Sequence, residues 1–212
     1  MFEINPKLQR CFTFGVWGNI CFFIFSIICF IYYQLFGHLG DLPIIKTSFE
    51  TMAYVVEGIG FVFMLLAMIW FARTVRQRII MKIFFLIYIL TELALMVLEL
   101  STYRVIDFYN PYSFPLALAH AIFSAFTCFT FLSLDPKRTA LEVVIVVSVG
   151  IMLTGMLGYT MNYRIYYSIL TNALGFAFMF TMIKFLLRQE RMEIDCYGDK
   201  ARVLEYRSDF FD

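Results

Sequence analysis

A chain of 212 residues with 61% hydrophobic residues, 16% charged residues and a mean hydropathy of +0.78 has too little polar side-chain surface to coat a water-soluble globule. These proportions exclude a soluble dinucleotide-binding enzyme, a secreted disulfide scaffold and a nucleic-acid-binding module. The net charge of +1 adds nothing about partners, because in such a chain the position of each charge carries the information.

Six apolar segments of about twenty residues or more follow one another along the chain. A helix rises about 1.5 Å per residue, so about twenty residues cross the roughly 30 Å hydrocarbon core. Backbone amides cannot stay unpaired in lipid, and runs of this length favour helices over a barrel. We therefore expect an all-α integral membrane protein with short loops. Its six-helix transmembrane domain covers residues 1–187, with spans at about 12–36, 51–72, 79–100, 114–134, 141–161 and 164–186.

Lysine and arginine concentrate on one set of span flanks, which predicts the orientation. The richer flanks carry Lys7, Arg10, Arg73, Arg76, Arg78, Lys82, Lys137, Arg138, Lys184, Arg188 and Arg191. The flanks on the opposite side carry Lys46, Arg104 and Arg164. By the positive-inside rule we expect a multi-pass cell-membrane protein with both termini cytoplasmic, in which residues 188–212 form a short cytoplasmic tail.

Several polar residues fall inside the predicted spans, where a charged group is expensive and needs an explanation. Counting about 1.5 Å per residue from the outer end of each span puts Glu57, His120, Glu92 and Asn172 roughly 7 to 12 Å below the outer boundary. They come from four different spans but share one level. If their side chains point inward, the bundle contains a polar, net acidic pocket in its outer half.

Helical spacing favours inward orientation for several of these groups. Tyr88 and Glu92 are four residues apart and share a face of the third span. His120 and Ser124 lie on a small or polar stripe of the fourth span. The fifth span has small residues at Gly150, Thr154 and Gly158, and such rows allow helices to approach closely. The candidate ligand-binding residues are Glu57, Glu92, His120, Asn172, Tyr88 and Ser124.

Each of these residues also has a purely structural interpretation. His120 and Asn172 could serve only as hydrogen-bonding groups between helices, and a carboxylate beside His120 would make a titratable pair. The glycine and threonine row of the fifth span is typical of packing. Glu57 and Glu92 could be protonated and silent, but their position in the spans favours function.

Catalytic and cofactor motifs are absent from the sequence. No Gly-x-Ser-x-Gly or His-Glu-x-x-His motif and no phosphate-binding glycine loop occurs, and the chain has only two histidines. Its five cysteines form no Cys-x-x-Cys pair. We therefore expect no enzyme activity, no cofactor and no metal site.

The leading hypothesis is a non-enzymatic protein that binds a small cationic or amine-containing solute in an outward-facing polar pocket, as part of membrane transport. The main alternative is a membrane sensor, receptor or interaction protein that signals through its cytoplasmic tail. A lipid-modifying membrane enzyme using Glu57, Glu92 and His120 is the second alternative. The expected partners are the lipid bilayer, a small molecule or cation, and a cytoplasmic or membrane partner subunit, but not nucleic acid.

Overall fold

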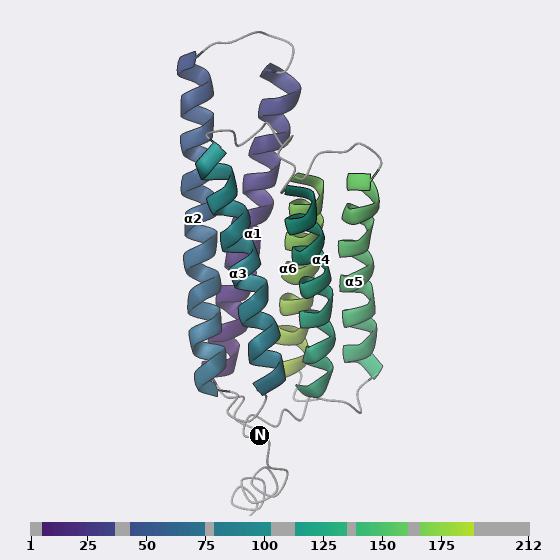
Figure 1. The fold of residues 1–212 in the computed structure, drawn as a ribbon. Helices are drawn as coiled ribbons and strands as arrows, with labels where there is room; N and C mark the ends of the chain where they lie inside the picture. Colours follow the sequence, from purple (N-terminus) through teal and green to yellow (C-terminus); the bar gives the residue numbers. More distant parts are fainter. Residues whose placement is uncertain are drawn as a thin grey trace, which may run out of the picture.

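The computed structural model describes residues 6–36, 43–74, 79–102, 113–134, 139–160 and 166–188. These ranges are entirely helical (Figure 1). The predicted tail, residues 188–212, lies outside the described residues beyond Arg188. The helices are α1 (Pro6–Phe36), α2 (Pro43–Thr74), α3 (Ile79–Thr102), α4 (Ser113–Thr130), the 3₁₀ turn η1 (Phe131–Leu134), α5 (Thr139–Thr160) and α6 (Tyr166–Arg188).

Five helices, α1, α2, α3, α5 and α6, are long and apolar enough to cross a membrane. The apolar part of α4, Pro115–Thr130, is shorter, and η1 continues it by four residues. The exposed surface of these helices is rich in large apolar side chains such as Val62, Leu90 and Val146, whereas polar groups such as Asn19 and His120 are buried. A helical bundle with this much apolar side-chain surface on its outside, and with polar groups buried inside, is that of a multi-pass membrane protein.

The first two helices are longer than the apolar segments that predicted them. α1 and α2 begin at Pro6 and Pro43, and proline is favoured at the first helical position because its missing amide would have no intrahelical partner there. Their 31 and 32 residues make each about 46 to 48 Å long. They extend past the other helices at the end where α1 finishes and α2 starts, which we call the hairpin end (top of Figure 1).

Helix α1 lies at the centre of the packing. It packs extensively against α2 on one side and α6 on the other, and α5 packs on the far side of α6. The helices α3 and α4 pack against each other and run alongside this row on one side of it, in front in Figure 1. Every described helix therefore has at least one face toward a common core.

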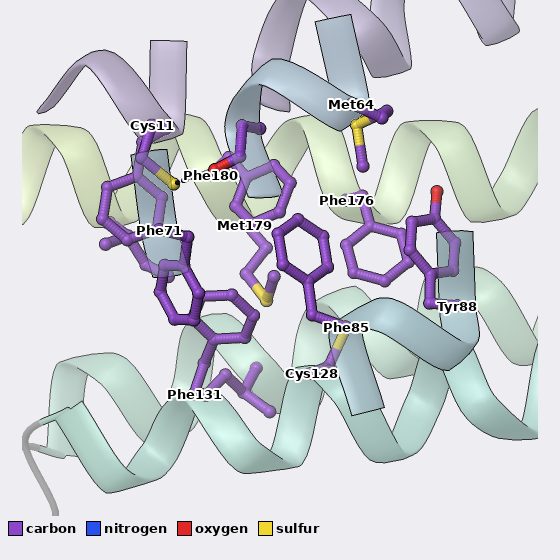
Figure 2. Packing of buried hydrophobic residues seen from close by; sticks show 14 of the residues in the cluster. Cys11, Met64, Phe71, Phe85, Tyr88, Cys128, Phe131, Phe176, Met179 and Phe180 are labelled. Carbon is purple, nitrogen blue, oxygen red and sulfur yellow. Dashed lines mark hydrogen bonds between the residues drawn. The ribbon is translucent and has the colours of Figure 1, made fainter. Parts of the chain in front are cut away.

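A phenylalanine cluster fills the half of the core away from the hairpin end (Figure 2). Its ring centroids lie 5.8 Å apart for Phe12 and Phe180, and 5.7 Å apart for Phe71 and Phe85. Phe131 lies 5.7 Å from Phe180 and 6.3 Å from Phe85. The tilted and edge-on geometries are those that aromatic quadrupoles favour. Phenylalanine rings from five elements thus pack together in one cluster.

Glycines allow close approach in two helix pairs, α1 with α2 and α5 with α6. A Cβ added at Gly60 of α2 would lie 3.1 Å from the carbonyl oxygen of Gly18 in α1. A Cβ added at Gly175 of α6 would lie 2.8 Å from the carbonyl oxygen of Ser148 in α5. Both glycines are buried, so these helix pairs are held at a distance that only a residue without a side chain permits.

The expectation that Gly150 and Thr154 form a packing row is wrong. Both residues are exposed on the outer side of α5, and no atom lies within 4 Å of a Cβ added at Gly150. The helix instead turns Ser148 and Met152 toward α6. Helix α5 is apolar on all sides, so its hydrophobic pattern did not determine which face packs. The surroundings of Gly158 lie outside the part of α5 whose burial is described.

Substitution of Gly175 by alanine tests the α5–α6 approach. The added methyl group meets backbone that cannot rotate away, so we expect Gly175→Ala to lower the free energy of unfolding by about 1 to 3 kcal/mol. Gly150→Ala is the matched control, because its methyl group meets open space and alanine gains up to about 1 kcal/mol in helix propensity. Unfolding in mixed micelles measures both variants, and equal effects would contradict this packing.

Candidate binding site

Polar side chains gather in the core between the phenylalanine cluster and the hairpin end. We call Glu57, Thr91, Glu92, His120 and Asn172 the polar layer. They come from α2, α3, α4 and α6, and all except the partly buried Thr91 are at most 6% exposed. Polar groups at this depth need partners, since an unpaired one costs about 1 to 3 kcal/mol.

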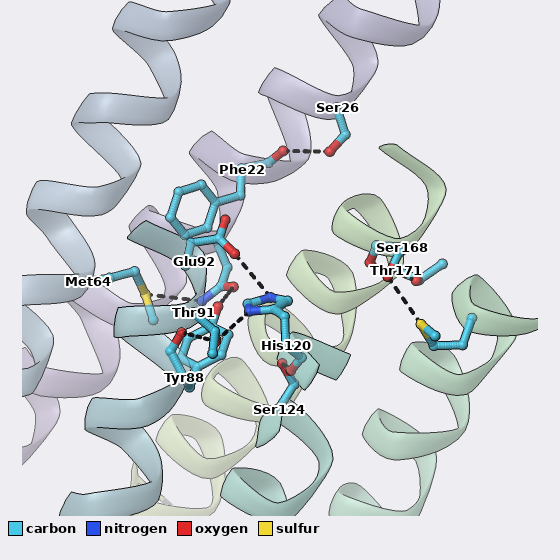
Figure 3. A network of polar contacts seen from close by, with 12 residues as sticks. Phe22, Ser26, Met64, Tyr88, Thr91, Glu92, His120, Ser124, Ser168 and Thr171 are labelled. Carbon is cyan, nitrogen blue, oxygen red and sulfur yellow. Dashed lines mark hydrogen bonds and ion pairs between the residues drawn. The ribbon is translucent and has the colours of Figure 1, made fainter. Parts of the chain in front are cut away.

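A carboxylate–imidazole pair joins α3 to α4 (Figure 3). His120 Nε2 lies 3.0 Å from Glu92 Oε2, and His120 Nδ1 lies 3.0 Å from the hydroxyl of Thr91. That hydroxyl is also 2.9 Å from the carbonyl oxygen of Tyr88 and is placed to donate to it. Both ring nitrogens of His120 are therefore engaged by α3.

A second group of contacts closes the polar layer on the side of the phenylalanine cluster. The Tyr88 ring lies 4.4 Å from that of Phe176 and 5.1 Å from that of His120. The Tyr88 hydroxyl lies 3.5 Å from Asn19 Oδ1, at the long limit for a hydrogen bond. The Asn19 amide donates to the carbonyl oxygen of Gly15 at 2.8 Å and lies 3.3 Å from Met64 Sδ. The Tyr88 and Phe176 rings thus bound the polar layer on this side, and we call them the aromatic floor.

The positions of Glu92 and Asn172 follow from this floor. Glu92 is four residues beyond Tyr88 on α3, and Asn172 is four residues before Phe176 on α6. Since α3 runs toward the hairpin end and α6 runs away from it, both residues lie one turn above the Tyr88–Phe176 contact, in the direction of the hairpin end. Glu57 is seven residues before Met64 on α2, so it lies about two turns closer to the hairpin end than the Met64–Asn19 contact, on the same face of the helix.

Two members of the polar layer have atoms without partners. Glu57 Oε2, Asn172 Nδ2 and Asn172 Oδ1 are buried and form no hydrogen bond within the described helices. Glu57 is 3% exposed and Asn172 is 2% exposed. Whether Glu57 is ionised or protonated, an oxygen at this depth needs a hydrogen-bonding partner. These open atoms are where an occupant would gain most.

The six candidate residues have different contacts in the structure. Glu92 and His120 are in direct contact, and Tyr88 forms the floor beside them. The Ser124 hydroxyl donates to the carbonyl oxygen of His120 at 2.6 Å, within α4. Glu57 and Asn172 lie on α2 and α6 with open polar atoms. Their binding of a ligand remains a prediction.

Sequence reasoning missed Thr91. Its hydroxyl reaches His120 because α3 and α4 pack side by side, and no spacing within α3 reveals a contact to another helix. Among the described residues, no three His, Cys, Asp or Glu side chains group closely enough to hold a metal ion. The chemistry available is that of a carboxylate for cations and of a carboxylate–imidazole pair for protons.

Comparison with protein-family models, with curated proteins and with solved structures finds no match to this chain. The function must therefore be argued from the site itself.

A double-variant comparison tests the Glu92–His120 pair. His120→Leu leaves a buried carboxyl group without its partner, so we expect a loss of about 3 to 5 kcal/mol in the free energy of unfolding. The combined Glu92→Leu/His120→Leu variant should lose less, because no unpaired charge remains. Ser124→Ala is the control, since its hydroxyl bonds only its own helix and its loss should be nearly neutral. Strictly additive single effects would contradict a paired interaction.

Proposed function

We propose that this protein is a non-enzymatic, six-span transport protein of the cell membrane that binds a small ammonium-type solute in the polar layer. Both termini are cytoplasmic in this proposal, which makes the hairpin end the outer end. The distribution of lysine and arginine along the sequence supports that orientation. The short α4, with η1, supplies the sixth crossing.

The buried Glu57 carboxyl group is the observation that carries the proposal. Glu92 has His120 as its partner, whereas Glu57 Oε2 has none within the described helices. A cation that also offers N–H donors would satisfy its charge and its hydrogen bonding together. One open carboxylate favours a monovalent occupant over a divalent one.

Asn172 restricts the chemical class of the solute further. Its side chain leaves both a donor, Nδ2, and an acceptor, Oδ1, without partners. A bare ammonium group can satisfy only the acceptor, since it has no lone pair to accept from Nδ2. A solute with a hydroxyl group next to its ammonium group, as in an amino alcohol, supplies both.

His120 has a supporting role in this proposal. Both of its ring nitrogens contact α3, one through Glu92 and one through Thr91. It therefore holds Glu92 in place and leaves the open atoms of Glu57 and Asn172 to contact the solute. Ser124 bonds its own helix backbone and Tyr88 closes the floor.

A sensor is the second candidate, and the phenylalanine cluster favours it. This packed body lies between the polar layer and the other end of the bundle, so a solute reaching the layer from the hairpin end would not pass through this conformation. Transport then requires the cluster to separate, whereas sensing requires only that binding shifts its packing. A partner subunit belongs to either mechanism.

Ethanolamine binding to the purified protein in lipid nanodiscs tests the solute class. We expect Glu57→Gln to weaken binding at least about tenfold, because it removes the open carboxylate of the polar layer while keeping the side-chain shape. Glu142→Gln, an exposed glutamate in the first turn of α5, is the control with the same chemical change. Calorimetry gives both affinities. Unchanged binding by Glu57→Gln, or equal binding of tetramethylammonium, which has no N–H donors, would refute the proposal.

Deletion of residues 197–212 separates transport from sensing. A transporter should keep most of its ethanolamine uptake into proteoliposomes after this deletion, because the polar layer and the helices remain. A sensor should show no uptake with or without the tail and should still bind ethanolamine. If the intact chain takes up ethanolamine and the truncated chain does not, the result contradicts both the transporter and the sensor as described here.

A further inference from the structure

We infer that Thr91, Glu92 and His120 form a reversible proton-binding site that releases one proton when a monovalent cation binds at Glu57. The cation half of this exchange rests on the function proposed above. The proton half rests on the hydrogen-bond geometry alone. The inference follows from counting the hydrogens available to three contacts: Glu92 to His120, His120 to Thr91, and Thr91 to the Tyr88 carbonyl oxygen.

In the first state the Thr91 hydroxyl donates its only hydrogen to the carbonyl oxygen of Tyr88, at 2.9 Å. Its oxygen can then only accept, so His120 Nδ1 must carry a hydrogen to make the 3.0 Å contact. One more proton lies between His120 Nε2 and Glu92 Oε2, which are 3.0 Å apart. As an imidazolium beside a carboxylate, the pair is neutral overall and every contact is satisfied.

In the second state the pair has released one proton. The Thr91 hydroxyl rotates and donates to His120 Nδ1, which is now bare. Nε2 keeps its hydrogen and donates it to the Glu92 carboxylate. The same two side-chain contacts to His120 survive without any heavy atom moving, and the pair carries one negative charge. Rotation of one hydroxyl therefore lets a buried site lose a proton without leaving a ring nitrogen unpaired.

The surrounding groups couple this proton to the cation. Glu57 from α2, Tyr88 from α3 and Cys128 from α4 are the titratable side chains that face the pair or its aromatic floor in the described helices. The described part of α6 offers the neutral Asn172. Loss of the proton puts a negative charge in a buried layer that already contains Glu57, and with no cation present this charge is costly.

A cation at Glu57 reverses that balance, because it attracts the negative charge that the pair acquires on losing its proton. The exchange is balanced: the protonated pair and one external ammonium ion become the deprotonated pair with the ammonium ion bound, and one proton leaves to water. Linkage makes the effect reciprocal, so protonation of the pair weakens cation binding by the same factor.

Nitrogen-15 NMR of the histidine rings tests the inference directly. The chain has only two histidines, so a His38→Gln background leaves His120 as the single imidazole signal. We expect a ring protonated on both nitrogens at low pH and protonated only on Nε2 at high pH. Adding ethanolamine at constant pH should drive the same change and release about one proton per molecule bound, measured by calorimetry in buffers of different ionisation enthalpy.

Thr91→Val and Thr91→Ser separate the proton site from a packing role. Valine offers a partner to neither state of Nδ1, but the doubly protonated ring loses a charge-assisted hydrogen bond and the neutral ring only an ordinary one. Proton release on ethanolamine binding should therefore fall toward zero. Serine keeps the hydroxyl and should restore the release. Release by Thr91→Val equal to that of the unmodified chain would overturn the role of Thr91.

The remaining outcomes distinguish this inference from the proposed function. Ethanolamine binding with no change in the His120 ring would overturn the exchange and leave the binding proposal intact. A ring that titrates as expected in a protein that binds no ethanolamine would refute the binding proposal and, with it, the exchange. A high-pH ring protonated on Nδ1 instead of Nε2 would overturn the second proton state.

Discussion

The contact between Glu92 and His120 is the constraint on which the interior depends. A carboxyl group and an imidazole cannot remain in a bundle core separately without a large cost, but together they can be neutral and hydrogen-bonded. Their contact joins α3 to α4. The Thr91 hydroxyl supports it by contacting both His120 Nδ1 and the carbonyl oxygen of Tyr88. The polar layer exists at this level because one pair of helices supplies both halves of the interaction.

The rest of the core divides into two chemical regions around that pair. Toward one end the side chains are almost purely aromatic and interlock with ordinary ring geometry, as around Phe85 and Phe180. Toward the hairpin end the core also contains apolar residues such as Phe25 and Ile169, but Glu57 and Asn172 there have open polar atoms. A region packed by rings gains nothing from an occupant, whereas a region with open hydrogen-bonding atoms does. The open atoms of Glu57 and Asn172 are therefore the feature of the core that argues for a binding function.

The sequence predicted the helices and the inward orientation of the embedded polar groups, which are buried, because long apolar runs and embedded charges are strong signals in lipid. Helical spacing also placed Tyr88 and Glu92 on one buried face. It failed for α5, where apolar residues on every side left Gly150 free to face outward. It could not reveal the contact of Thr91 with His120, since that depends on how two helices pack. Periodicity orients a helix only when its faces differ.

The uneven strength of the helix contacts has a mechanical consequence. Helix α1 is bound closely to α2 and α6, with Gly60 setting the first spacing and Gly175 fixing α6 to α5, while α3 touches α2 far less than it touches α4. The weakest seam of the bundle therefore runs beside the α3–α4 hairpin. If α3 and α4 tilted together as one rigid unit, Glu92 and His120 would move together. Their distance from Glu57 would change, but their own contact would not break.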